Sequence, residues 1–206
     1  PPGINASQMF LWSEGAGFLA LNSSPSFLRA TGIDDSGTVT GSQNYGSARP
    51  CGSTATICSF IGNDTGITSV ITDQSFFAQD IEGGVVVGQG YVSIGGVTTA
   101  LPNGGGIAGA QAINGSGEIA GAVFVATTLP AYWASPTATP VIIDPLPGDT
   151  YGASWGINES GWVVGWSGSS TDPNDERHAF VWRPETGVTQ ALGTLPGGTD
   201  SEAFDI

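Results

Sequence analysis

The chain has 206 residues, of which 39% are hydrophobic and only 11% are charged, so it can bury a core and lacks the composition of a disordered acidic tail. Eighteen acidic residues face four arginines and no lysine, which gives a formal net charge of −14 at pH 7. That charge repels phosphate backbones and anionic lipid heads, so binding to nucleic acid or to membrane surfaces is disfavoured. No apolar run approaches the ~20 residues that a membrane-spanning helix needs, so membrane insertion is not expected either.

Related modules follow one another along the chain, each built from short runs with strand chemistry. In chain order the aromatic-rich runs are MFLW, CSFI, YVS, AYWA and HAFVW, and turn sequences such as LPGG and RPETG separate the later runs. β-Branched and aromatic residues favour strands, and runs this short do not form helices. Because no stretch shows a convincing 3.6-residue period, the sequence predicts an all-β protein.

A column of isoleucines marks the repeat. Its members lie 32 to 49 residues apart, and a small residue stands three positions before each. The first four are followed by a polar turn and an apolar run that ends in glycine: DDSGTVTG, EGGVVVG, NGSGEIAG and NESGWVVG. The column is Ile33, Ile81, Ile113, Ile157 and Ile206, and its small partners are Ala30, Ala78, Ala110, Ser154 and Ala203.

Four short strands in about 40 residues match the size of a β-propeller blade. We therefore expect one repeat domain, residues 1–206, with about five four-stranded blades, in which the small column residues let neighbouring sheets approach closely. A β-solenoid or a pair of sandwiches could use the same unit, because a sequence repeat does not fix the closure. The expected modules cover residues 9–43, 58–89, 91–122, 131–167 and 179–206.

The fifth module has three of its four expected strands. Residues 1–8, PPGINASQ, contain a Gly-Ile-Asn like that at 156–158, so the N-terminus is one candidate for completing the last blade. Two alternatives are open. In the first, the chain is a slice of a longer array. In the second, the unpaired edge of the fifth module accepts a strand from another copy and builds a homo-polymer by β-augmentation.

The C-terminal modules resemble a known repeat. HAFVW at 178–182, GVTQALGTLPGG at 187–198, SEAFDI at 201–206 and ASWGINESGWVVGWS at 153–167 are similar to the HAF repeat of bacterial extracellular proteins. The match is close over residues 145–206 and fades toward the N-terminus. The resemblance implies a secreted or surface-attached, propeller-like repeat protein, and it brings no catalytic motif to this chain.

The two cysteines, Cys51 and Cys58, are separated by six residues in the sequence CGSTATIC. A zinc site needs more ligands than this, and the only histidine, His178, is far away in sequence. A disulfide that closes the short loop is the preferred interpretation, and it would require an oxidising compartment. Two buried free thiols are the alternative.

A cluster of oxygen donors lies in the sequence DPNDE. Calcium takes about six to eight oxygen ligands, and loops of extracellular β proteins often supply them. The spacing is not that of an EF-hand, and a solvated loop is the alternative. The candidate structural calcium ligands are Asp172, Asn174, Asp175 and Glu176, and no other cofactor is predicted.

Three patterns suggest catalysis but have a structural explanation. GASWG at 152–156 fits a nucleophile elbow, yet the helix that would expose Ser154 is missing, and GGGIAG at 104–109 is predicted to be a turn. His178 has Asp175 and Glu176 nearby in sequence but no convincing nucleophile. No catalytic residue is therefore assigned.

The sequence favours a non-catalytic extracellular or cell-surface protein, a structural scaffold, adhesion or assembly module that binds proteins or glycans. Six tryptophans could stack on sugars, although several sit within strands and are expected to fill the core. The alternative is a carbohydrate-active hydrolase, a glycosidase-like propeller that uses channel carboxylates. By repeat position its carboxylates would be Asp34, Asp80, Glu118, Glu159 and Asp205.

Overall fold

The computed structural model describes residues 10–14, 17–20, 28–44, 57–71, 76–169 and 176–206. All regular secondary structure in these ranges is β-strand, and neighbouring strands pair antiparallel. The predicted all-β class is therefore confirmed. Within the same ranges, no helix has the length and apolarity needed to cross a bilayer.

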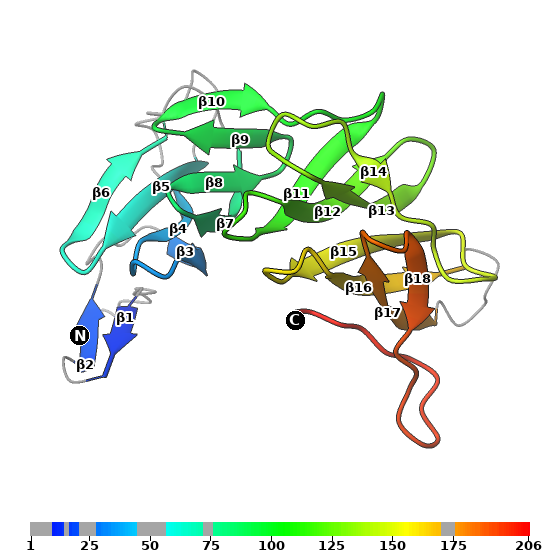
Figure 1. Cartoon of the computed structure of the whole chain (residues 1–206). Helices are drawn as coiled ribbons and strands as arrows, with labels where there is room; N and C mark the ends of the chain where they lie inside the picture. Colours follow the sequence, from blue (N-terminus) through cyan, green and yellow to red (C-terminus); the bar gives the residue numbers. More distant parts are fainter. Residues whose placement is uncertain (1–9, 15–16, 21–27, 45–56, 72–75, 170–175) are drawn as a thin grey trace. The chain divides into compact units, whose positions relative to one another are not determined.

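Four four-stranded meanders and one two-stranded hairpin make up the fold (Figure 1). The hairpin is β1 (Phe10–Ser13) and β2 (Gly17–Ala20). The first two sheets are β3 (Leu28–Ile33), β4 (Val39–Asn44), β5 (Ile57–Asn63) and β6 (Gly66–Val70), then β7 (Ala78–Glu82), β8 (Val85–Gly88), β9 (Tyr91–Ile94) and β10 (Val97–Ala100). The last two are β11 (Ile107–Ile113), β12 (Ile119–Phe124), β13 (Thr128–Trp133) and β14 (Val141–Ile142), then β15 (Tyr151–Ile157), β16 (Val163–Gly168), β17 (Arg177–Arg183) and β18 (Val188–Ala191).

The chain forms two compact units, Pro1–Thr99 and Ala100–Ile206. In each unit two sheets share an apolar core. In the first, Ile81 of β7 and Phe76, which precedes β7, pack with Ile61 of β5. In the second, Tyr132 of β13 packs with Trp182 of β17, their ring centroids 5.2 Å apart. Burial of apolar side chains between successive sheets therefore holds each unit together.

Each sheet begins at the isoleucine column. Its first strand carries the small residue and the isoleucine, its second strand contains the apolar run that ends in glycine, and its third contains the aromatic-rich run. Four-strand antiparallel meanders therefore occur, but they do not have the bounds of the expected modules. The expected modules start at the aromatic run, so the second, third and fourth each join the last two strands of one sheet to the first two of the next, while the first begins with the β1–β2 hairpin and the fifth has no following sheet. No closed barrel or propeller is detected among the described strands.

A β-bulge recurs at the same place in all four sheets, directly after the small column residue. The glycine that ends the apolar run of the second strand lies opposite that small residue. A Cβ on this glycine would lie 2.0–2.1 Å from a backbone oxygen of the first strand, so only glycine fits. The four glycines are Gly41, Gly88, Gly121 and Gly165.

Burial along the small-residue column is not uniform. Ala78, Ala110 and Ser154 are at most 1% exposed, whereas Ala203 is half-buried and Ala30 is exposed. The expectation that this column brings the sheets together is wrong at Ala30. Close approach between sheets occurs two residues later, where a Cβ on Gly32 would lie 2.8 Å from the Cα of Asp80.

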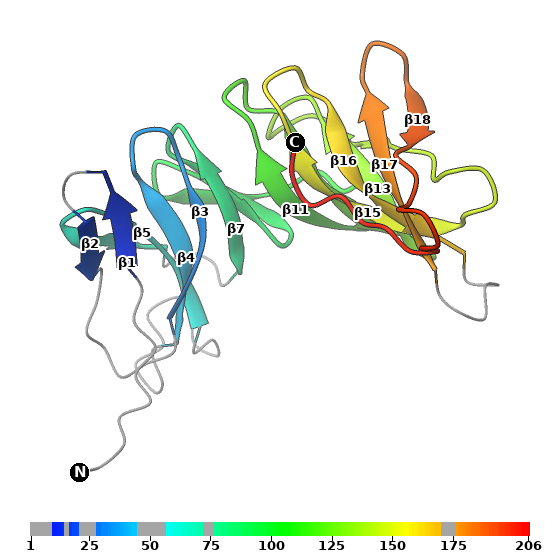
Figure 2. The same cartoon turned by 90° about the horizontal axis from the view of Figure 1, so that it is seen from below.

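The C-terminal segment, residues 201–206, approaches the last sheet as closely as the second sheet approaches the first at Gly32. A Cβ on Gly156 would lie 2.9 Å from the Cα of Asp205, and the backbone N–H of Ser201 donates to the carbonyl of Arg177 at 2.8 Å. Figure 2 shows this segment returning along β15. The segment therefore lies against the last sheet where the first strand of a following sheet would lie. Residues 1–8, the proposed N-terminal strand for the last blade, lie outside the described residues.

The polar turn after the isoleucine folds identically in three sheets. The side-chain oxygen of Asp34, Asn114 or Asn158 accepts the backbone N–H groups two and four residues later, at 2.9–3.1 Å. Each turn ends on a glycine with φ between +73° and +80°. These are Asx turns, in which the side chain satisfies the backbone donors of the loop.

Candidate functional site

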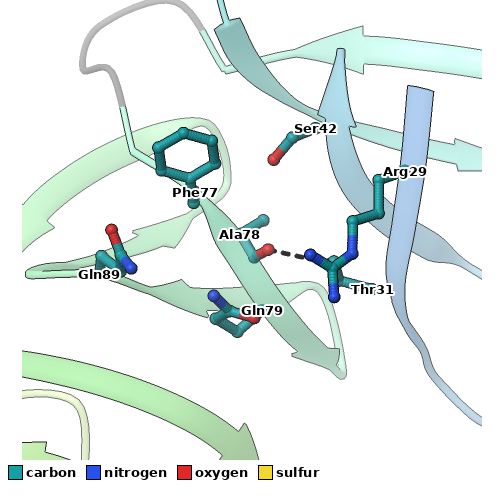
Figure 3. A pocket seen from close by; sticks show the side chains of 7 residues that line it. All are labelled: Arg29, Thr31, Ser42, Phe77, Ala78, Gln79 and Gln89. Atoms are coloured by element: carbon teal, nitrogen blue, oxygen red, sulfur yellow. Dashed lines mark hydrogen bonds between the residues drawn. The ribbon is translucent and has the colours of Figure 1, made fainter. Parts of the chain in front are cut away.

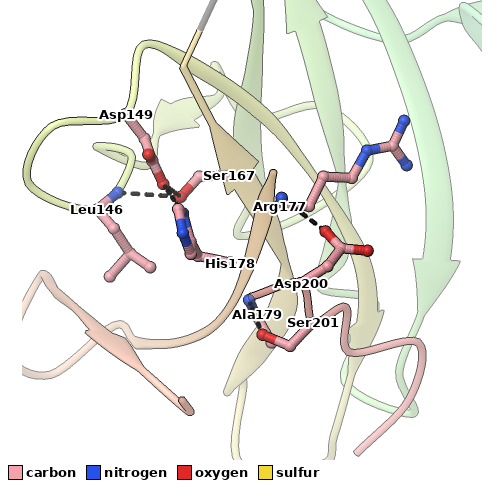
Figure 4. A network of polar contacts seen from close by, with 8 residues as sticks. All are labelled: Leu146, Asp149, Ser167, Arg177, His178, Ala179, Asp200 and Ser201. Carbon is pink, nitrogen blue, oxygen red and sulfur yellow. Dashed lines mark hydrogen bonds and ion pairs between the residues drawn. The ribbon is translucent and has the colours of Figure 1, made fainter. Parts of the chain in front are cut away.

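A polar network joins a turn to the last sheet (Figure 4). Asp149 closes the LPGD turn, Ser167 lies on β16, and His178 lies opposite Ser167 on β17. The Ser167 hydroxyl donates to Asp149 Oδ2 at 2.6 Å, and His178 Nδ1 lies 3.1 Å from the same oxygen. The Leu146 N–H in turn donates to Ser167 Oγ at 3.2 Å.

This arrangement is not a serine–histidine–aspartate triad. In a triad the histidine lies between serine and aspartate and takes the serine proton. Here Asp149 lies between the other two, and Ser167 is fully buried with its proton donated to Asp149. Because Ser167 is fully buried and also accepts the Leu146 N–H, it links the strand to the turn and presents no hydroxyl to solvent.

His178 remains the accessible member of the network. Its side chain is 41% exposed, whereas that of Asp149 is 7% exposed. The two line a surface hollow of about 270 Å³ together with Thr194 and Ser201. The sequence analysis paired His178 with Asp175 and Glu176, but the structure brings Asp149 to it from 29 residues away. The one signal in the sequence was the aspartate that ends LPGD where the equivalent turn reads LPGG.

A second cluster surrounds the tryptophans of the last sheet. The guanidinium of Arg177 lies 4.2 Å from the ring centroid of Trp166 and also pairs with Glu202. Trp155 stacks on Phe204 with centroids 4.4 Å apart. One face of Trp166 and one face of Trp155 are thus covered by the chain's own side chains, whereas Phe204 itself stays 66% exposed.

The remaining tryptophans divide between core and surface. Trp133 and Trp182 are 0% and 4% exposed, which confirms the expectation that several tryptophans fill the core. Arg183 covers Trp162 at 4.2 Å from its ring centroid. Trp12 on β1 is 58% exposed and is the candidate stacking residue that the described structure leaves most open.

The five proposed channel carboxylates all make structural hydrogen bonds. Glu118 accepts from Asn114 Nδ2 at 2.7 Å and from the Tyr132 hydroxyl, and burial together with this contact raises the pKa of Tyr132. Glu159 Oε1 accepts the N–H of Gly115 at 3.0 Å. The other three accept backbone N–H groups within four residues of themselves: Asp34, Asp80 and Asp205.

The other predicted sites fall partly outside the described residues. Cys58 is fully buried on β5, but Cys51 lies outside, so the disulfide stays a prediction. Of the calcium ligands, only Glu176 is described, half-buried just before β17. Among the residues that the structure does describe, no group of three or more potential metal ligands comes together. The three calcium ligands outside are Asp172, Asn174 and Asp175.

Comparison with known proteins adds no relative. No family model matches the chain, and no curated protein matches its sequence. The similarity to the HAF repeat therefore stays a prediction from the quoted motifs.

Proposed function

We propose that this chain is a non-catalytic extracellular or cell-surface repeat protein, a structural scaffold for adhesion or assembly that binds proteins or glycans. The observation that carries the proposal is a polar ladder between the hairpin tips of the last two sheets. Asn114 Nδ2 donates to the carbonyl of Asn158 at 2.9 Å, and the Gly115 N–H donates to Glu159. Polar groups of one module thus hold the next module in place.

The same ladder argues against the hydrolase alternative. A retaining or inverting glycosidase needs two carboxyl groups that face a substrate, one of them free to give up a proton. Glu118 and Glu159, the two candidates at these hairpin tips, instead accept hydrogen bonds from the turns that they hold. Stacking of modules accounts for their positions.

The finer architecture that we propose is a propeller-like array of about five blades. Two features support it. The β1–β2 hairpin carries an aromatic-rich run, as the third strand of each blade does, so it corresponds to the third and fourth strands of a blade. Residues 201–206 lie beside the last sheet at the place of the first strand of a following blade. The N-terminus or another chain would complete the last blade.

Association of copies forms part of the proposal. Large apolar side chains of the last sheet and the C-terminal segment are 44–83% exposed, and burial of such a surface favours contact with a like surface. The repeat itself stacks sheet on sheet, so a second copy is the expected occupant. The side chains are Val188, Leu192, Leu195, Phe204 and Ile206.

One set of measurements tests the function. Glycan-array binding, reducing-sugar release and light scattering are carried out on the same preparation of the intact chain. We expect glycan or protein binding, or concentration-dependent association, without sugar release. Sugar release that is lost in Glu118→Gln would establish the hydrolase instead. A monodisperse monomer that binds no glycan and no protein would overturn the proposal.

A further inference from the structure

A hollow of about 250 Å³ lies between the first two sheets of unit 1 (Figure 3). Residues from β3 and β4 form one side, and residues from β7 and its neighbours form the other. No carboxylate lines it, although the chain carries eighteen acidic residues. The lining residues are Arg29, Thr31, Ser42, Phe77, Ala78, Gln79 and Gln89.

The hollow exists because unit 1 departs from the packing of the C-terminal modules. By repeat position, Thr31 corresponds to Trp155 and Gln79 corresponds to Phe204. In the C-terminal pair those two rings stack and fill the space. Shorter polar side chains stand at both positions in unit 1, and Ser42 stands where Trp166 lies in the last sheet.

One polar group in the hollow lacks a partner. Ser42 is 7% exposed, and its hydroxyl has no hydrogen-bond partner among the described residues. In Figure 3 this hydroxyl points from β4 toward Phe77. A buried hydroxyl without a partner is unfavourable, so a ligand that supplies one gains affinity. Thr31, in contrast, is satisfied, since its hydroxyl donates to the carbonyl of Ala78 at 2.9 Å.

The rest of the lining combines three chemistries. Phe77 is 45% exposed and offers an apolar ring face. Gln79 and Gln89 offer amide donors and acceptors. Arg29 is exposed, and it is the only positively charged side chain among the described residues of unit 1. An arginine binds a carboxylate through two parallel hydrogen bonds.

We propose that this hollow binds a carboxylate-bearing sugar, such as one uronic acid unit of an anionic polysaccharide. The sugar ring packs on Phe77, its hydroxyl groups bond to the two glutamine amides and Ser42, and its carboxylate pairs with Arg29. The negative net charge of the chain repels anionic ligands elsewhere on the surface, so binding concentrates at this arginine. The inference rests on the proposed glycan binding and names its ligand class.

Calorimetric titration of the intact chain with tetragalacturonate, and with a neutral tetrasaccharide of galactose, tests the site. We expect the acidic oligomer to bind and the neutral one to bind at least about tenfold more weakly, since the arginine–carboxylate pair is lost. Equal affinity for the two oligomers would overturn the inference.

Two variants locate the binding. Arg29→Gln should weaken binding of the acidic oligomer about tenfold or more, and Ser42→Ala about threefold to tenfold with the melting temperature retained. Arg183→Gln, on the last sheet, is the matched control and should leave affinity unchanged. Loss of affinity in Arg183→Gln but not in Arg29→Gln would place the site elsewhere.

The outcomes separate this inference from the proposed function. Glycan binding that persists in both Arg29→Gln and Ser42→Ala overturns the pocket and leaves the scaffold function standing. Binding of a glutamate-rich peptide as tightly as the acidic sugar overturns the choice of sugar as ligand. A chain that binds neither oligomer overturns the pocket, and the scaffold function falls as well only if the chain is also a monomer that binds no other glycan and no protein.

Discussion

At the scale of single residues, the contact between Tyr132 and Glu118 links a hairpin tip to the core of unit 2. The Tyr132 hydroxyl donates to Glu118, and its ring packs against Trp182. Glu118 in turn accepts from Asn114, which bonds to the next module. One carboxylate therefore connects the Asx turn, the core and the module interface.

We predict that Tyr132→Phe lowers the free energy of unfolding at pH 7 by about 1–2 kcal/mol, because it leaves a carboxylate oxygen of Glu118 unpaired. Its pH dependence should change as well. Burial raises the pKa of Tyr132, so the folded chain keeps this proton at pH values where an unfolded tyrosine, which titrates near pH 10, has lost it. That stabilisation is complete below about pH 10 and declines as the pH rises above it.

Urea unfolding at a series of pH values from 7 to 11 measures both effects. The decline in stability above about pH 10 should be steeper in the wild-type chain than in Tyr132→Phe. Identical slopes for the two proteins would show that Tyr132 does not hold its proton more tightly in the folded chain.

At the scale of the strands, the repeated β-bulge explains why an apolar run always ends in glycine. A Cβ at Gly121 would lie 2.1 Å from the carbonyl oxygen of Gly109, which is backbone and cannot rotate away. On the partner strand, a Cβ on Gly109 would have its nearest backbone oxygen 4.0 Å away, and the φ of Gly109 is not in the positive range. Two glycines of one sheet therefore differ in what they tolerate.

Gly121→Ala should destabilise unit 2 by about 3 kcal/mol or more, because β11 and β12 must separate to admit the methyl group. Gly109→Ala should be within about 1 kcal/mol of wild type. Chemical denaturation of both variants measures the difference. If both substitutions cost the same, the bulge does not bring the backbones as close as described.

At the scale of the whole molecule, a closed propeller predicts a compact particle. A single compact domain of 206 residues has a radius of gyration of about 17 Å. Small-angle scattering of a monomeric sample should give a value close to this if the blades close into a ring. A clearly larger radius would indicate an open array of sheets.

Much of the fold could be predicted from repeats in the sequence. The isoleucine column, the Asx turns at Asp34, Asn114 and Asn158, and the four-strand meander all follow from local residue preferences, which act over a few positions. The location of the close approach between sheets could not be predicted. It includes Gly32 and Gly156, which lie two residues after the small column and just beyond the bulge.

The candidate sites were less predictable. His178 could be named from sequence, but its partner Asp149 could not, since a turn after β14 carries it there across 29 residues. No motif in the sequence indicated the hollow at Ser42. It arises from small polar side chains at positions where the C-terminal modules place rings.

The sequence by itself determined that this protein is all-β and built from repeated meanders, because strand and turn preferences are local and repeat with the modules. Only the tertiary structure decided which polar groups meet and where space is left between sheets. Those properties depend on side chains that lie far apart in the chain, and on how closely two backbones can approach once the strands have paired.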